Sequence, residues 1–155
     1  MTGEPTLKVE GLKTHFFTEA GVVKSVDGVD LAVSRGEILG LVGESGSGKS
    51  VTGFSILGLI DPPGRIVGGS VRLNGEELTS ASPKRLRSLR GDRIAMIFQD
   101  PMMTLNPVMK IETQMIETLQ AHSPIGRAEA RAKARDALGR VGIPSPEERL
   151  DSYPH

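Results

Sequence analysis

The chain has 155 residues, enough for one ordinary domain with a sizeable core. Its 19 basic and 19 acidic side chains give a formal net charge of zero, so charge alone gives no reason to expect a nucleic acid or an anionic membrane as partner. The lack of cysteine excludes disulfides and thiolate metal sites within the chain. We expect no secretory signal and no membrane helix, because the longest apolar runs fall well short of about 20 residues.

Short strands, mostly antiparallel, are predicted for the first part of the chain. They are expected over residues 7–17, 22–26 and 29–33. Asp27 and Gly28 form a turn signal between the second and the third. Residues 38–42, Ile-Leu-Gly-Leu-Val, are a continuous apolar run that predicts a buried strand. A helix is expected over residues 51–60, because the following Asp-Pro-Pro-Gly sequence ends it.

The second part predicts a hairpin and several helices. Asn74-Gly75 is a strong hairpin signal and centres a predicted hairpin over residues 71–78. Ser82 followed by Pro83 predicts a capped helix that stops at Gly91. Residues 93–99 contain an apolar run that predicts a second buried strand. Further helices are expected over residues 110–121, over residues 127–141 and from Ser145 onward.

Residues 43–50 read Gly-Glu-Ser-Gly-Ser-Gly-Lys-Ser and fit the phosphate-loop pattern G-x-x-x-x-G-K-[ST]. The predicted strand before the loop and the predicted helix after it are the flanks that such a loop requires. This order gathers backbone N–H groups at a helix N-terminus, whose partial positive charge attracts an anion. A Gly/Ser-rich turn that binds nothing is the alternative, but the complete spacing favours a nucleoside triphosphate site.

Two side chains of the loop have specific chemistry. In such a loop we expect Lys49 to reach the β- and γ-phosphates and the Ser50 hydroxyl to ligate Mg²⁺. Glycines allow backbone angles and close approach that a Cβ would obstruct. The predicted nucleotide-binding residues are Gly43, Glu44, Ser45, Gly46, Ser47, Gly48, Lys49, Ser50 and Val51.

Basic residues gather in two stretches, residues 84–93 and 127–140. We interpret both as solvated helix faces, because a nucleic-acid site would also need an aromatic platform or a positive overall charge. Met102 and Met103 flank a loop and are either core filler or a patch for a partner protein.

A second motif narrows the family. Residues 99–107, from Gln99 to Pro107, read Gln-Asp-Pro-Met-Met-Thr-Leu-Asn-Pro after an apolar run. At this separation from the phosphate loop, the segment resembles the Q-loop of the nucleotide-binding subunits of ABC transporters. Its amino-acid sequence is similar to that of the dipeptide, oligopeptide and nickel importer branch. Val-Asp-Gly-Val at residues 26–29 and Leu-Asp-Ser-Tyr-Pro-His at residues 150–155 also resemble family sequences, the latter the stretch just before the signature motif.

The resemblance implies an α/β fold: a RecA-like P-loop NTPase core with an antiparallel β subdomain, plus the beginning of a helical subdomain. Residues 1–100 would form the ATP-binding core with the β subdomain, and residues 101–155 the start of the helical part. ATP and Mg²⁺ would be the cofactors. Gln99 would touch the metal or the attacking water. Phe16 would stack on adenine, with Phe17 as second choice and a core position as the alternative for Phe16.

The resemblance also implies partners. The loop of residues 99–107 would lie against a membrane-spanning permease subunit, a second ATPase subunit (identical or different) would complete the ATP site, and an extracytoplasmic substrate-binding protein would act indirectly. The location would be the cytoplasmic face of the cell membrane, with no nucleic acid bound. The family's signature motif, catalytic Glu and switch His are not in these residues, so we expect this stretch alone to bind nucleotide weakly and hardly to hydrolyse it.

Three other functions stay open from sequence. A soluble ABC-type ATPase acting on ribosomes or DNA is disfavoured, because the sequence of residues 102–107 resembles that of transporters and the chain has no strongly basic arm. A P-loop GTPase would need a guanine-specifying Asn-Lys-x-Asp segment, which is absent; a small-molecule kinase is the related option. The third is a binding module without catalytic activity.

Overall fold

The computed structural model describes residues 4–100 and 104–155. The chain forms two compact units, Met1–Arg90 and Gly91–His155. Each is described by itself below. Met102 and Met103, interpreted from sequence as either core filler or a partner patch, lie outside the described residues.

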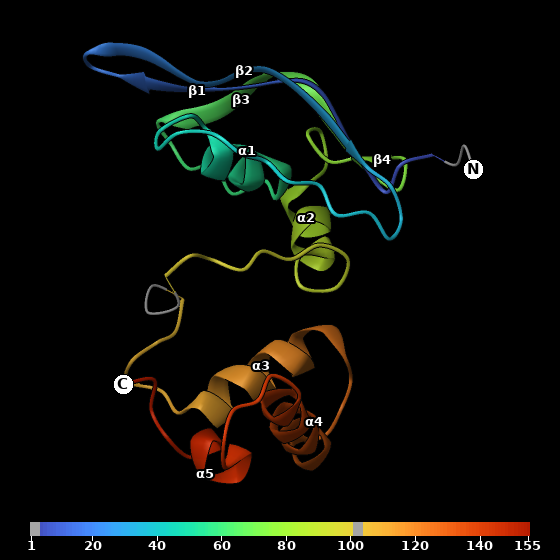
Figure 1. The fold of residues 1–155 in the computed structure, drawn as a ribbon, viewed down its shortest axis with the longest axis vertical. Coiled ribbons are helices and arrows are strands. Elements are labelled where there is room, and N and C mark those ends of the chain that lie inside the picture. Colours follow the sequence, from blue (N-terminus) through green and yellow to red (C-terminus); the bar gives the residue numbers. More distant parts are fainter. Residues whose placement is uncertain (1–3, 101–103) are drawn as a thin grey trace. The chain divides into compact units, whose positions relative to one another are not determined.

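The first unit is built on an antiparallel sheet, drawn in blue and green in Figure 1. The strand order is β2-β1-β3-β4, and each neighbouring pair is antiparallel. The strands are β1 (Leu7–Thr18), β2 (Gly21–Val33), β3 (Gly64–Leu73) and β4 (Glu76–Glu77). The central strand β1 is therefore paired along both edges, and its apolar residues supply much of the core.

A β-bulge in β1 decides which side chains point inward. The pairing register of β1 shifts between Val9 and Leu12, around Gly11, whose φ is 56°. The extra residue moves the buried set from odd to even positions, so that Val9, Leu12 and Thr14 are all buried. The helix α1 (Lys49–Ile56) packs on this inner face, where Thr14 Oγ1 and Ser55 Oγ share a buried hydrogen bond of 2.7 Å.

The predicted turn at Asp27 and Gly28 is wrong. The structure has one strand, β2, through both predicted strands, and Lys13 of β1 pairs with Asp27. Gly28 has a φ of 90° and lies at an irregularity of the ladder rather than at a chain reversal. The long partner β1 keeps both halves of β2 paired, so the glycine produces a bulge instead of a turn.

The predicted hairpin and the predicted capped helix are confirmed. Asn74 and Gly75, with φ of 49° and 81°, turn β3 into β4. The Ser82 hydroxyl accepts a 3.2 Å hydrogen bond from the Arg85 backbone N–H at the start of α2 (Pro83–Leu89). After this helix, Arg90 donates to the carbonyl oxygens of Leu57 and Gly58 at 2.8 and 2.6 Å, which satisfies the carbonyl end of α1.

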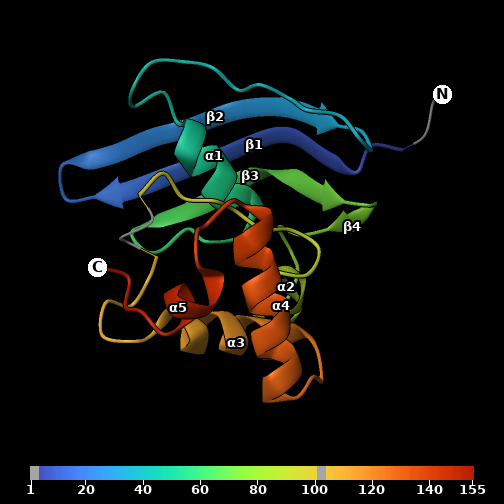
Figure 2. The ribbon, with the colours of Figure 1, turned by 60° about the horizontal axis from the view of Figure 1, so that its bottom comes forward.

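The second unit contains three helices, in orange to red in Figure 2: α3 (Ile111–His122), α4 (Arg127–Arg140) and α5 (Pro146–Leu150). They confirm the helices predicted from residue 110 onward. Their shared core holds Ile116, Leu150 and two alanines of α4, Ala130 and Ala134, all with at most 3% of their surface exposed. The small alanines let α4 approach its neighbours closely. No helix among the described residues is long and apolar enough to span a bilayer.

The two predicted buried strands are wrong for this chain. Residues 38–42 and 93–99 form no strand, and Ile38 and Ile97 are 97% and 98% exposed. Their composition suits a strand with sheet neighbours on both sides and both faces covered. Among the described residues no strand pairs with either segment. An apolar run without such neighbours has no ladder to join.

Candidate functional site

The glycine-rich loop leads directly into α1. Ser47 N donates to Glu44 O at 3.2 Å, which closes a tight turn ahead of the helix. Gly48 is the N-cap of α1, with a φ of 88°, and Thr52 N donates to Gly48 O at 2.8 Å as an early hydrogen bond of the helix. Turn and helix start together form the compact loop that the sequence pattern predicts.

Two glycines of the loop have close neighbours: at Gly48 the neighbour is backbone and leaves no room for a larger residue, whereas at Gly43 it is a serine hydroxyl that can rotate away. A Cβ at Gly48 would lie 2.2 Å from the Ser25 carbonyl oxygen of β2, well inside van der Waals contact. A Cβ at Gly43 would lie 2.7 Å from Ser47 Oγ. Gly46 differs: it has a φ of 81°, but its surroundings are open. The loop is thus held against the inner face of the sheet at Gly48 and is open at Gly46.

Lys49 turns its ammonium back onto the loop. Its Nζ donates to Gly43 O at 2.8 Å, to Glu44 O at 2.6 Å and to Ser47 Oγ at 3.3 Å. These contacts fix a positive charge beside the backbone of the loop. The three N–H donors of the ammonium are all used in these contacts, so Lys49 would exchange some of them for phosphate oxygens when a nucleotide binds.

The N-terminus of α1 is available to an anion. The helix has no acidic residue in its first turn and no side-chain cap, so neither a carboxylate nor a hydroxyl of the helix start competes for its first N–H groups. Ser50 is exposed in that first turn. Its hydroxyl is a hard oxygen donor of the type that Mg²⁺ accepts. The donor set therefore fits a phosphate chain with its magnesium ion.

The structure separates the two aromatic candidates for adenine stacking. Phe16 lies close to the chain segment after α1, because a Cβ at Gly64 would meet the Phe16 ring at 2.5 Å and Ile60 at 2.8 Å. Phe17 is paired with Val22 and carries the Arg65 guanidinium 4.1 Å from its ring centroid. By the alternation of β1, Phe16 shares the face of Thr14 and α1, and Phe17 points to the opposite face.

Gln99 is exposed and belongs to the second unit, so its predicted role at the metal or the attacking water stays a prediction. The end of its loop is fixed by a residue that sequence reasoning missed. Gln114 of α3 accepts from Asn106 N at 2.8 Å and donates to the carbonyl oxygens of Asn106 and Met109, both at 3.0 Å. The sequence signal for this role was a polar glutamine among the apolar residues Ile111 and Met115 of the predicted helix.

A groove of about 340 Å³ lies beside this loop. Thr104 and Leu105 form part of its wall, and α3 and α4 supply the rest, mainly with apolar side chains and the stem of Lys133. Gln114 is also in its lining, so the residue that fixes the loop belongs to the wall of the groove.

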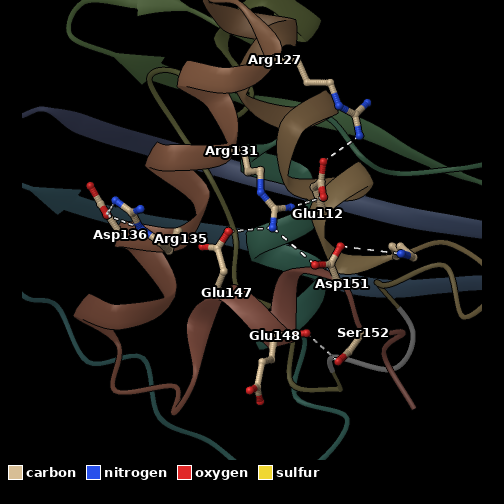
Figure 3. A network of polar contacts seen from close by, with 10 residues as sticks. Glu112, Arg127, Arg131, Arg135, Asp136, Glu147, Glu148, Asp151 and Ser152 are labelled. Carbon is tan, nitrogen blue, oxygen red and sulfur yellow. Dashed lines mark hydrogen bonds and ion pairs between the residues drawn. The ribbon is translucent and has the colours of Figure 1, made fainter.

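Most of the basic residues of α4 are paired with acids, as Figure 3 shows. Arg131 contacts Glu112 of α3 and donates to Glu147 of α5 at 2.8 Å, and Asp151 lies 3.4 Å away. The hydrogen bond to Glu147 is the main cause that raises the pKa of Arg131. Arg127 donates to the other oxygen of Glu112 at 2.7 Å. This network joins the three helices. The predicted solvated face holds for Arg127, which is 69% exposed, but not for Arg131, which is 28% exposed and packed between helices.

Comparison with known proteins decides the family. The family model described as ABC transporter matches residues 26–155, most of the chain. The chain belongs to the ABC transporter family. The family model agrees with the resemblance inferred from the sequence motifs, because the phosphate loop and residues 99–107 both lie inside the matched region.

The relatives of this ABC transporter family chain include transport ATP-binding proteins. It is 45% identical over 149 residues to the dipeptide transport ATP-binding protein DppD of Escherichia coli. It is 48% identical over 151 residues to a putative peptide import ATP-binding protein of Brucella abortus and 44% identical over 150 to the oligopeptide transport ATP-binding protein AppD of Bacillus subtilis. These alignments cover 96–97% of the chain but 46% of each relative. The chain spans about half the length of the relatives that it matches.

Solved structures confirm the fold. A dimeric post-hydrolysis state of the ATP-binding cassette MJ0796, bound to ADP and Pi, aligns with a TM-score of 0.83 at 20% identity and covers 96% of this chain and 61% of that one. A second dimeric MJ0796 structure aligns with a TM-score of 0.80. At such low identity the likeness supports the predicted α/β P-loop NTPase fold of an ABC family member. The residue-level roles and the boundary at residue 100 stay predictions.

Proposed function

We propose that this chain is the nucleotide-binding part of an ABC-type ATPase that drives import of dipeptides or oligopeptides. The phosphate loop carries the proposal: Lys49 is fixed by three contacts, Gly48 fits against β2, and the α1 N-terminus has no acid of its own. The identity of 44–48% to proteins named for dipeptide, oligopeptide or peptide transport supports the class of cargo.

In the proposed reaction the loop positions ATP and neutralises charge. The N–H groups of residues 43–51 and the Lys49 ammonium hold the β- and γ-phosphate oxygens, and Ser50 Oγ holds Mg²⁺, which supplies further charge neutralisation when bound. Phe16, on the face that α1 covers, is our candidate for the adenine contact, although its ring already contacts the segment after α1. Gln99 is the candidate for sensing the γ-phosphate.

The loop of residues 99–107 and the adjacent groove are the proposed contact for a permease subunit. The apolar lining of the groove suits a helical segment of a partner, and Gln114 keeps its loop wall in one conformation. The proposal also includes a second ATPase subunit, an indirect role for an extracytoplasmic binding protein and a location on the cytoplasmic face of the membrane. Residues 1–155 alone should turn over ATP hardly at all.

The proposed coupling is tested in the intact transporter in proteoliposomes, with dipeptide uptake and ATP turnover measured together. We expect Gln99→Ala to lower uptake per ATP hydrolysed while nucleotide affinity stays near the parent value. The matched control is Gln120→Ala, an exposed glutamine of α3. Equal loss of nucleotide binding and uptake in Gln99→Ala would show that Gln99 is structural. ATP turnover that peptide does not stimulate, without any peptide uptake, would contradict the proposal that the cargo is a peptide.

A further inference from the structure

The sheet of the first unit has one covered face and one open face. The inner face receives α1 through Thr14 and Ser55, and Figure 1 shows the helices and loops of this unit on that side of the strands. No helix or strand of residues 4–90 covers the other face. We call the end of this open face nearest the β1–β2 turn the outer patch. It consists of Lys13, His15, Phe17, Val22, Lys24, Asp27 and Arg65. Val67 follows Ile66 in β3, at a bulge where it has no partner in β1, so it is not part of the patch.

Pairing within the sheet brings these residues together. Lys13 pairs with Asp27, Phe17 with Val22, and His15 with Lys24 on one side and Arg65 on the other. Residues paired directly across two strands share a face. The patch is therefore carried by three strands of the sheet rather than by a loop, and its geometry is set by the backbone ladder.

The patch has more cationic charge than it can neutralise. Asp27 is its single carboxylate, and Lys13, Lys24 and His15 Nε2 all approach it, at 3.9, 3.7 and 3.6 Å. Arg65 lies over the Phe17 ring and has no acidic partner among the described residues. Three fixed cations, Lys13, Lys24 and Arg65, therefore face one carboxylate, and only the two lysines approach it.

Apolar surface is exposed beside these cations. Phe17 and Val22 are 38% and 52% exposed. The Arg65 guanidinium lies 4.1 Å from the Phe17 ring centroid, so this exposed apolar ring has a cation on its face. A ligand that satisfied Arg65 with a carboxylate would also cover apolar side chains that now face water.

We propose that the outer patch is a docking surface for an acidic polypeptide segment that also carries apolar side chains. Its carboxylates pair with Arg65 and Lys24, and its apolar side chains cover Phe17 and Val22. This surface is on the face of the sheet opposite α1, so it does not overlap the phosphate and adenine contacts proposed above.

The charge pattern favours a polypeptide over an anionic membrane. Recognition of anionic lipid by a surface uses clusters of about 4–8 Lys or Arg residues. The patch has three, and Asp27 lies among them. A membrane presents negative charge everywhere and would be repelled by Asp27, whereas a polypeptide can place its carboxylates on either side of it.

The test uses the 155-residue chain, a short blocked peptide of Glu, Leu and Gly, and the same peptide with Gln in place of Glu. Binding is followed by the amide NMR signals of β1, β2 and β3. We expect the Glu peptide at about 1 mM to shift the signals of Phe17, Val22 and Lys24. Lys24→Glu/Arg65→Glu should weaken binding at least about tenfold, because two attractions become repulsions. Lys24→Gln/Arg65→Gln should be intermediate and keeps the test valid if the first variant does not fold.

The matched control is Lys84→Glu/Arg87→Glu, an equal charge change on exposed positions of α2, which should bind like the parent. Lys49→Ala should also bind like the parent, so failure of the nucleotide proposal would leave this result unchanged. Equal binding of the Gln peptide, or equal weakening by the α2 variant, would overturn the proposal. So would the absence of any shift, or binding to phosphatidylserine vesicles that needs Lys24 and Arg65 when the peptide does not bind.

Discussion

Strand β1 mixes apolar and polar residues, whereas residues 38–42 are a continuous apolar run, yet it is the more apolar segment that is exposed. In β1, Val9 and Leu12 are at most 1% exposed, because β2 and β3 pair with both edges and α1 covers one face. In the segment, Ile38 and Val42 are 97% and 90% exposed, and no described strand pairs with it. The difference shows that burial of an apolar run depends on its neighbours, since a strand without a ladder leaves both its backbone groups and its side chains in water.

The largest expected effect is the difference in stability between truncating a side chain to alanine in β1 and doing so in residues 38–42. Leu12→Ala should lower the free energy of unfolding by about 2–5 kcal/mol, because it opens a cavity at a fully buried site. Ile38→Ala removes a side chain that is 97% exposed and should change it by less than about 0.5 kcal/mol. Urea unfolding of the two variants measures both. A similar loss in each would mean that residues 38–42 are buried after all.

The phosphate loop lies at the junction between these regions, and its glycines provide the next test. Gly48→Ala should displace the loop and abolish Mg-ATP binding, because the new Cβ would lie 2.2 Å from the Ser25 carbonyl oxygen. Gly46→Ala meets no atom within 4 Å and should cost only the strain of its positive φ, roughly 1–2 kcal/mol. Nucleotide titration and thermal unfolding of both variants check this. Retained binding in Gly48→Ala would show that the contact with β2 is not needed.

The helical unit depends on a charged network as well as on its small apolar core. Glu112→Gln should lower stability by roughly 1–3 kcal/mol, because Glu112 is 8% exposed and accepts from two arginines. Glu117→Gln on an exposed position of the same helix is the control and should be near neutral. Thermal unfolding of the chain measures the pair. Equal effects would mean that the network adds nothing to the packing of α3, α4 and α5.

The smallest expected effect concerns pH at the β4 edge of the sheet. The hydrogen bonds from Arg85 lower the pKa of Glu76. Burial raises the pKa of Glu77, but hydrogen bonds from Thr79 and Val71 and the charge of Arg72 outweigh it and lower that pKa too. Both carboxylates therefore stabilise the fold above the ordinary glutamate pKa of 4.5, and this contribution is lost as pH falls through their lowered values. Glu76→Gln/Glu77→Gln should flatten the acid limb of the stability curve, and an unchanged limb would contradict this.

Features that depend on residues close together in the chain could be predicted from sequence, and features that depend on distant neighbours could not. The Asn74-Gly75 turn, the Ser82 cap and the phosphate loop depend on residues close together in the chain, and their local patterns were sufficient. The two buried strands were mispredicted because their burial depends on neighbours that the pattern does not contain. The bulge at Gly11 reverses which aromatic faces α1, and strict alternation from Leu7 and Val9 would have chosen Phe17. The contact of Gln114 with Asn106 required knowing how a loop folds back on a helix.

The central claim is that residues 43–51 bind the phosphates of ATP. Equilibrium dialysis of the 155-residue chain against Mg-ATP tests it most directly, with Lys49→Ala compared with Lys84→Ala. We expect measurable binding by the parent, the same affinity for Lys84→Ala, and no binding by Lys49→Ala, because the fixed ammonium beside Gly43 and Glu44 is lost. Equal affinity of the parent and Lys49→Ala would contradict the claim.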